Sequence, residues 1–334
     1  MLLAITLAVG APALAAAGDG PTRGTVSGAI RLLTPDASLG EANVEVLAFP
    51  QGGEVSAVAE TVTSTGRYEL QLDIELNTSY FVLVTYEDIQ YLSNPLVLSP
   101  DAPTVSADFE VYATTATAPE LRIETTTVTL LAIDRERAEL TFIREDAIAL
   151  DEPLIYVGAE DGITLRLPVP ENTTDAGGME ADDEDYRFDG GTVAVATPLR
   201  PGVTSVVTRY TVRYEADKDE YRLRITAPVN TDRMAIRVPQ RFLREVRPVG
   251  DDATLGADEA FESGSGSEPL TVIERTSPAT PGQGLIADLR GLSGIERNSH
   301  PLTSGAGAVV GALLALLVVS GAAVGLQRIR GRTA

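Results

Sequence analysis

Tyr80 to Tyr86 has the sequence YFVLVTY, an apolar run of aromatic and β-branched residues around which the N-terminal region is arranged. Its tyrosine and valine side chains fall on one face of an extended chain, and Phe81 and Leu83 fall on the other. A strand that is apolar on both faces belongs inside a sheet, whereas a half-buried strand alternates with polar residues. We therefore place this run at the centre of a sheet.

Shorter segments on both sides of this run alternate apolar and polar residues, as half-buried strands do. These segments are Thr25 to Leu33, Val44 to Ala48, Tyr68 to Leu72 and Val105 to Val111. Turn-forming residues separate them at 34–36, 51–53, 64–66 and 93–95. Short strands between closely spaced turns are typical of a β-sandwich. No helical period of useful length appears between residues 22 and 295.

The same region carries a spaced pattern of small and aromatic residues. It consists of a first strand with Gly28, a second strand with alternate valines from Val44, a turn with Gly66 before Tyr68, and a further strand that starts at Tyr80. This pattern resembles the carboxypeptidase regulatory-like domain, a transthyretin-like β-sandwich, over residues 24 to 113. It departs from the family at Leu-Thr-Pro-Asp after the first strand and at Asn-Thr-Ser before Tyr80, which leaves the subfamily open. The resemblance implies a non-catalytic accessory or ligand-contact module at residues 22–113.

A second β-rich region follows a polar hinge at Thr114 to Pro119, and we set its bounds at residues 120–295. Its alternating segments are 121–133, 139–144, 163–167, 192–196, 205–214, 221–225, 234–238, 270–274 and 284–292. An acidic insertion at residues 172–191 interrupts them. The predicted fold class is therefore all-β, with two tandem Ig-like or transthyretin-like β-sandwiches and one C-terminal transmembrane helix.

The transmembrane helix is predicted at Gly305 to Leu326, which contains no charged residue. At ~1.5 Å per residue such a helix crosses the ~30 Å hydrocarbon core of a bilayer. The arginines that follow it predict a cytoplasmic tail at residues 327–334, after a stalk at 296–304. Apolar residues at the start, followed by Ala-Leu-Ala-Ala-Ala, predict a signal peptide at residues 1–17, although no Lys or Arg begins it. An uncleaved N-terminal anchor is the alternative. The predicted location is the plasma membrane, with a single span and the N-terminus outside.

Composition excludes several kinds of site. The chain has no cysteine and only one histidine, His300, so cysteine or histidine metal sites, thiol chemistry and a Ser-His-Asp triad lack their components. The net charge is −22, from 48 acidic and 26 basic residues. A surface with this excess of negative charge repels nucleic acid, so we expect no nucleic-acid partner.

An acidic run with flanking glycines is the candidate metal site. Its carboxylates include Asp182, Asp183, Asp185 and Asp189, and hard oxygen ligands of this kind suit Ca²⁺. The spacing is not that of an EF-hand, because the sharp-turn glycine and the closing glutamate are missing. A solvated acidic loop is the alternative, and no other cofactor is expected.

A second candidate is an arginine face. If residues 205–214 and 221–225 form a hairpin, alternation turns Val206, Tyr210, Val212, Tyr214, Leu223 and Ile225 inward. The arginines then point outward together as a surface for an anionic partner, namely Arg209, Arg213, Arg222, Arg224 and, from a neighbouring strand, Arg237. The alternative is that each arginine pairs with a carboxylate of a neighbouring strand.

Small residues recur four positions apart in the predicted membrane helix, at Gly307, Gly311, Gly321 and Gly325. Such pairs let two helices approach closely and favour a homodimer, although alanine- and glycine-rich spans are also common by composition alone.

These features together predict a membrane-anchored, non-enzymatic binding, adhesion or assembly protein of the cell envelope, with the lipid bilayer and envelope proteins as partners. The alternative is an accessory subunit of an export or cytochrome-maturation complex that associates through its transmembrane helix. A carboxylate-based hydrolase is a third class. No motif locates its carboxylate pair, and the chain has no tryptophan for a sugar-binding cleft.

Overall fold

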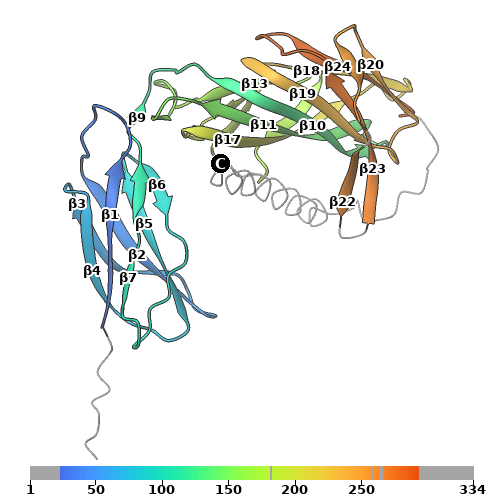
Figure 1. Cartoon of the computed structure of the whole chain (residues 1–334). Coiled ribbons are helices and arrows are strands. Elements are labelled where there is room, and N and C mark those ends of the chain that lie inside the picture. Colours follow the sequence, from blue (N-terminus) through green and yellow to red (C-terminus); the bar gives the residue numbers. More distant parts are fainter. Residues whose placement is uncertain (1–22, 181–182, 258, 264–265, 293–334) are drawn as a thin grey trace, which may run out of the picture. The chain divides into compact units, whose positions relative to one another are not determined.

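The computed structural model describes residues 23–292 except 181–182, 258 and 264–265. All regular structure in these residues is β-strand, which confirms the all-β prediction for this part of the chain (Figure 1). The predicted signal peptide, stalk, membrane helix with its four glycines, and tail lie outside the described residues. No helix within the described ranges is long and apolar enough to span a membrane. Contacts divide the chain into two compact units, residues 1–113 and 114–334.

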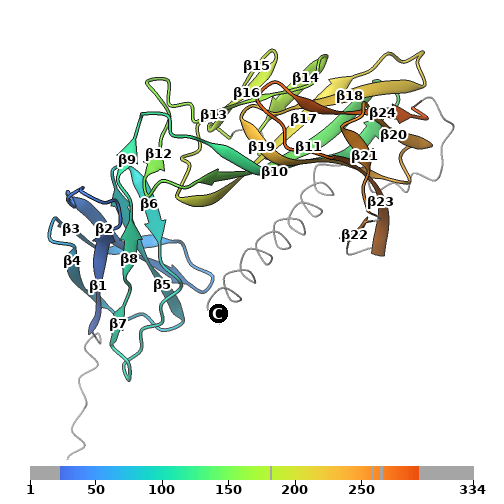
Figure 2. The same cartoon turned by 45° about the horizontal axis from the view of Figure 1, so that its top comes forward.

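Unit 1 consists of two four-stranded sheets. In the first, β1 (Arg23–Leu32) lies between β4 (Arg67–Asp73) and β7 (Thr104–Ser106), and β8 (Phe109–Val111) also pairs with β1. The second has the order β3 (Ser56–Thr63), β2 (Ala42–Pro50), β5 (Thr78–Tyr86) and β6 (Ile89–Leu92) (Figure 2). The apolar run at Tyr80 to Tyr86 lies in β5, inside its sheet, as predicted. Alternate side chains of both sheets meet in one core.

The first sheet of unit 1 closes tightly around Gly28. The Tyr68 hydroxyl donates to the Ala107 carbonyl at 2.5 Å, and burial raises the pKa of this hydroxyl above its usual range. A Cβ on Gly28 would lie 1.9 Å from that same carbonyl oxygen and 2.6 Å from the Tyr68 hydroxyl. Only glycine lets the backbone pass here. Gly66, with φ of 72°, forms the turn that the sequence predicts before Tyr68.

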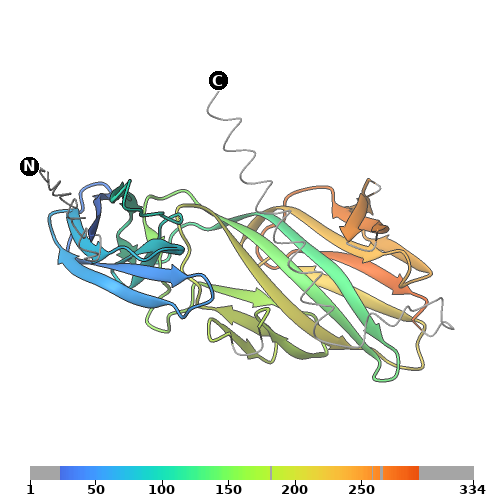
Figure 3. The same ribbon diagram turned by 90° about the horizontal axis from the view of Figure 1, so that it is seen from below.

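Unit 2 is built on one large sheet, whose long strands lie side by side in Figure 3. In spatial order its strands are β14 (Thr173–Gly177), β17 (Gly202–Arg213), β11 (Glu139–Leu150), β10 (Arg122–Asp134), β19 (Asn230–Pro239), β23 (Gly266–Arg275) and β21 (Ala253–Leu255), and β22 (Glu259–Ser263) pairs with β23. The pairs are antiparallel except β10 with β19, which is parallel. Two short strands, β9 (Thr114–Thr115) and β12 (Ile155–Tyr156), form a separate parallel pair.

Two three-stranded sheets cover the large one. The first has the order β13 (Leu165–Pro168), β16 (Thr192–Val195), β15 (Tyr186–Asp189), and the second β18 (Glu220–Thr226), β24 (Gly284–Arg290), β20 (Glu245–Val249). Leu140 and Phe142 of β11 pack with the second small sheet, and Ile148 and Leu150 pack with the first. Alternate residues of a strand share a face. Both small sheets therefore cover the same face of the large sheet.

A buried ion pair lies on β11 between these two cores. Arg144 Nε is 2.7 Å from Asp146 Oδ2, and the two side chains are 1% and 0% exposed. The Thr126 hydroxyl donates to Asp146 Oδ1 at 2.6 Å. Arg144 Nη1 also donates to the carbonyl oxygens of Pro168 at 3.0 Å and Thr226 at 3.5 Å, which lie at the ends of β13 and β18. One guanidinium thus joins the large sheet to both small ones.

One detail of the predicted organisation is wrong. β17 and β18 do not form a hairpin, because β17 pairs with β11 and β14 while β18 pairs with β24. Both strands turn their apolar sides toward one core, so the chain between them crosses from one sheet to the other. The acidic insertion contains two strands, β14 and β15.

Candidate binding site beside the β18–β24–β20 sheet

The outer face of the β18–β24–β20 sheet carries charges of alternating sign. Its inner side chains, among them Leu223, Leu285 and Leu289, are buried in the core. The strand register places the outer side chains in rows across the sheet, Glu220–Arg290–Glu245 and Arg222–Asp288–Arg247. Each central residue therefore has the opposite charge on both sides. Opposite charges in directly facing positions stabilise a sheet, whereas like charges destabilise it.

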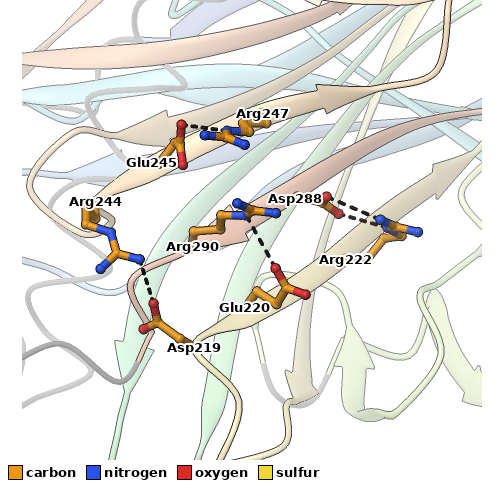
Figure 4. Close-up of polar contacts among 8 residues, drawn as sticks. All are labelled: Asp219, Glu220, Arg222, Arg244, Glu245, Arg247, Asp288 and Arg290. Carbon is orange, nitrogen blue, oxygen red and sulfur yellow. Dashed lines mark hydrogen bonds and ion pairs between the residues drawn. The ribbon is translucent and has the colours of Figure 1, made fainter.

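Ion pairs form both within these rows and between them (Figure 4). Arg222 makes two hydrogen bonds to Asp288, at 2.8 Å from Nε and 3.2 Å from Nη2, and this contact raises the pKa of Arg222. Arg247 Nε donates to Glu245 Oε1 at 2.5 Å. Arg290 Nε lies 3.3 Å from Glu220 Oε2 without hydrogen-bond alignment. At the end of the sheet, Arg244 Nη2 lies 2.8 Å from Asp219 Oδ2. The face is therefore largely self-neutralised.

A cleft of about 730 Å³ adjoins this face along β18. The segment 169–172, between β13 and β14, forms one wall, and β18 with Asp288 of β24 forms another. The chain that leaves β17 lines the remaining side with residues 213–215 and Lys218. Tyr214 and Tyr221 contribute aromatic surface. The volume falls within the ~300–1,000 Å³ of ligand-binding clefts.

Most charges in this cleft have partners. Arg213 Nη2 is 3.1 Å from Glu139 Oε1, and Lys218 Nζ is 2.7 Å from Glu215 Oε1. Arg222 and Glu220 pair with residues of β24, as above. Arg224 differs, because its register partner on β24 is Ile286 and its one hydrogen bond is a 3.3 Å contact from Nη2 to the Gly282 carbonyl. No carboxylate among the described residues forms an ion pair with Arg224.

Glu171 is the corresponding carboxylate of the cleft, since its side chain has no ion pair within the described part of the chain. It is exposed in the β13–β14 connection, where its backbone carbonyl accepts a 3.4 Å hydrogen bond from the Tyr221 hydroxyl. Burial, with a contribution from the Glu171 charge, raises the pKa of Tyr221 to about 12. Tyr221 is therefore a neutral hydrogen-bonding group at physiological pH.

An unpaired hydroxyl is buried near Tyr221. The Tyr210 side chain of β17 is 1% exposed, and its hydroxyl has no hydrogen-bond partner among the described residues. Burial raises the pKa of Tyr210 far above its usual range, Arg144 lowers it, and Tyr221 and Asp146 raise it further. This hydroxyl and the Arg144–Asp146 pair thus form a polar cluster within the core.

The structure divides the predicted arginine face. Arg213, Arg222 and Arg224 line the cleft, whereas Arg209 and Arg237 do not. Arg209 Nη2 lies 3.5 Å from Asp175 Oδ2, and Arg237 Nε lies 2.8 Å from Glu259 Oε2. Four of the five arginines thus have carboxylate partners, as expected if these arginines pair with carboxylates and do not form a free basic surface. Arg224 is the exception.

The candidate calcium ligands are only partly described. Asp182 lies outside the described residues. Asp183 Oδ1 accepts a hydrogen bond from the backbone of Asp185 at 3.2 Å, and Asp189 ends β15. Within the described ranges, no three His, Cys, Asp or Glu side chains are grouped so that they could hold a metal ion. A calcium site that includes Asp182 stays a prediction.

Arg237 also acts on Glu145, a partly buried carboxylate of β11. Burial raises the pKa of Glu145, Arg237 lowers it, and the neighbouring Asp146 raises it again, with a net increase. The folded state therefore binds this proton more tightly than the unfolded state does. Protonated Glu145 therefore stabilises the folded state. This contribution is fully present below the pKa of the unfolded chain, near 4.5, and is lost as the pH rises through the higher pKa of the folded protein.

Replacing Glu145 by glutamine is therefore expected to stabilise the protein at neutral pH and to have a smaller effect in acid. The measurement is the free energy of unfolding from urea titrations of the full-length protein near pH 7 and near pH 4. Glu136→Gln, in the exposed turn between β10 and β11 of the same unit, is the control and is expected to show no such difference. An equal effect of Glu145→Gln at both pH values would contradict the assignment.

The cleft cannot be predicted from the sequence, because its walls are formed by strands that are distant in the chain. The strand predicted at 139–144 is also too short, because β11 continues to Leu150. One signal was available, since Arg144 and Asp146 are in phase with the apolar Leu140, Phe142 and Ile148. Opposite charges two positions apart on an apolar strand face indicate a buried pair.

Comparisons with known proteins do not place the chain in a family. No family model matches it, and no curated protein matches it. Among solved structures, a 9R-lipoxygenase from Cyanothece PCC8801 aligns with 30% of this chain and 17% of its own, at 15% identity and a TM-score of 0.19. The chain thus spans a small part of that protein, and a likeness at this TM-score carries no argument about fold or function.

Proposed function

We propose that the protein is a membrane-anchored, non-enzymatic binding or assembly protein of the cell envelope and that unit 2 contacts its partner through the cleft beside β18. The single observation that carries the proposal is this cleft, in which Arg224 is a cation without a carboxylate partner among the described residues. The other cations of the cleft already have carboxylate partners, which leaves Arg224 as the one available to an anionic group among the described residues.

The membrane anchor and outward orientation rest on the sequence, from the uncharged run at 305–326 and the arginines after it. For unit 1 we propose an accessory module of the carboxypeptidase regulatory-like type. Its two four-stranded sheets around one core, the Gly66 turn and the buried Tyr68 support this proposal.

The experiment is affinity purification of the tagged full-length protein from its native membrane in mild detergent. It is compared with two variants, Arg224→Gln and a fourfold Gly→Leu change at positions 307, 311, 321 and 325. We expect a defined set of envelope proteins that is retained by the Gly→Leu variant and reduced in Arg224→Gln.

Two results would contradict the proposal. If the partners are lost only with the Gly→Leu variant, the helix is the binding surface and the chain is an accessory subunit of a membrane complex. If the native protein recovers no specific partner, the binding function itself is wrong.

A further inference from the structure

We propose that the cleft beside β18 binds a short peptide segment that carries one carboxylate and one cationic group. The peptide carboxylate pairs with Arg224 and its cationic group pairs with Glu171. This inference rests on the proposed function and names the chemical class of the partner.

Arg224 supplies the anion-binding half of the site. Every other arginine on the outer face of the β18–β24–β20 sheet contacts a carboxylate, and only Arg224 faces an apolar residue across the strand pair. It is exposed on the cleft wall and is held by a single long hydrogen bond to Gly282. A guanidinium presents its N–H groups as a fork that matches a carboxylate in two parallel hydrogen bonds.

Glu171 supplies the cation-binding half. It lies on the wall formed by residues 169–172, whereas Arg224 lies on β18. Tyr221, also on β18, packs against the edge of the core and lines the same cleft, and its hydroxyl makes only a 3.4 Å bond to the Glu171 backbone carbonyl, so it remains a hydrogen-bonding group for a ligand. Because Glu171 and Arg224 occupy separate positions in the cleft, they suit a ligand that carries both a cationic and an anionic group.

The remaining charges of the cleft argue against a polyanion. Glu215, Glu220 and Asp288 line the same space, and the cations beside them are already paired with carboxylates. A nucleic acid or a polyuronate would bring many negative charges and nothing to pair with Glu171. A peptide with one acidic and one basic side chain leaves no charge of the cleft uncompensated.

The test uses the full-length protein in detergent and fluorescein-labelled, end-capped peptides with one aspartate and one lysine separated by one to four glycines. Fluorescence anisotropy gives the dissociation constant. Companion peptides carry asparagine in place of aspartate, or norleucine in place of lysine. The protein variants are Arg224→Gln and Glu171→Gln, with Arg247→Gln as the control, because Arg247 lies on the same sheet face but outside the cleft.

We expect at least one spacing to bind saturably, and each cleft variant to weaken binding by about tenfold or more, as for a lost hydrogen bond to a charged group. The asparagine peptide should lose nothing further in Arg224→Gln, and the norleucine peptide nothing further in Glu171→Gln, which assigns each charge to its partner. Arg247→Gln should leave the dissociation constant unchanged.

Three outcomes would overturn the inference. In the first, no peptide of the series binds at millimolar concentration. In the second, a singly charged peptide binds as well as the doubly charged one, and in the third, Arg247→Gln weakens binding as much as Arg224→Gln. Competition by a uronic-acid disaccharide that depends on Arg224 but not on Glu171 would assign the cleft to an acidic sugar instead. If envelope partners still co-purify through Arg224 in the membrane experiment, only the peptide inference fails and the binding function stands.

Discussion

Replacing Asp146 by alanine is expected to lower the free energy of unfolding of unit 2 by about 3–5 kcal/mol, the usual loss when one member of a buried ion pair is removed. The change leaves the fully buried Arg144 guanidinium without its carboxylate and the Thr126 hydroxyl without its acceptor. The loss should appear in urea unfolding and as faster amide exchange in peptides from β11, β13 and β18, measured by mass spectrometry of the full-length protein.

The double variant Arg144→Met with Asp146→Leu is the matched control. Apolar side chains of similar volume often replace a buried ion pair with little loss of stability, so this variant should be much more stable than Asp146→Ala. Asp288→Ala breaks an exposed pair on the small sheet and should change stability little. If Asp146→Ala is no more harmful than Asp288→Ala, the pair does not hold the two small sheets to the large one.

Replacing Gly28 by alanine is expected to destabilise unit 1 at the upper end of the ~1–3 kcal/mol typical of overpacking, or beyond it. The new methyl group would meet the Ala107 carbonyl oxygen, which is backbone and cannot rotate away. It would also displace the Tyr68 hydroxyl from that carbonyl. Amide exchange in peptides from β1, β4 and β7 should therefore accelerate, while peptides from β11 should not change.

Gly40→Ala is the control within the same unit. A Cβ on Gly40 would meet only the Tyr86 ring at 3.9 Å, an ordinary contact. Its substitution should leave exchange in unit 1 unchanged. Equal behaviour of the two alanine variants would show that β1 can shift away from residue 107, contrary to the close packing seen around Gly28.

The sequence predicts local features of this fold well. Alternation places Val206, Tyr210 and Val212 inward and Arg222 and Arg224 outward, and the structure agrees. It does not predict which strands pair. The short chain between β17 and β18 suggests a hairpin, yet β18 pairs with β24, whose sequence lies far beyond it. Pairing depends on the complementary faces of strands that are distant in the sequence, and the local periodicity of one strand does not show which other strand it pairs with.

The candidate site follows the same pattern. The sequence identifies Arg213, Arg222 and Arg224 as outward-facing residues. It does not identify Glu171 as part of the site, because the order of the strands in the sheets is what brings residues 169–172 next to β18. The distinction between Arg224 and its neighbours also depends on register. Ile286 rather than a carboxylate lies opposite Arg224, whereas Asp288 lies opposite Arg222.

The parallel pairing of β10 with β19 bears on the order in which unit 2 can fold during synthesis. Arg122 of β10 pairs with Asn230 of β19, so the ribosome must produce most of the unit before the middle of its large sheet can close. Closure of so long a loop is entropically unfavourable, and sheets with such distant pairings fold slowly. Until β19 arrives, the β10–β11 hairpin presents an open backbone edge that can pair with other chains. The newly made protein therefore passes through an aggregation-prone stage, during which a chaperone would protect it.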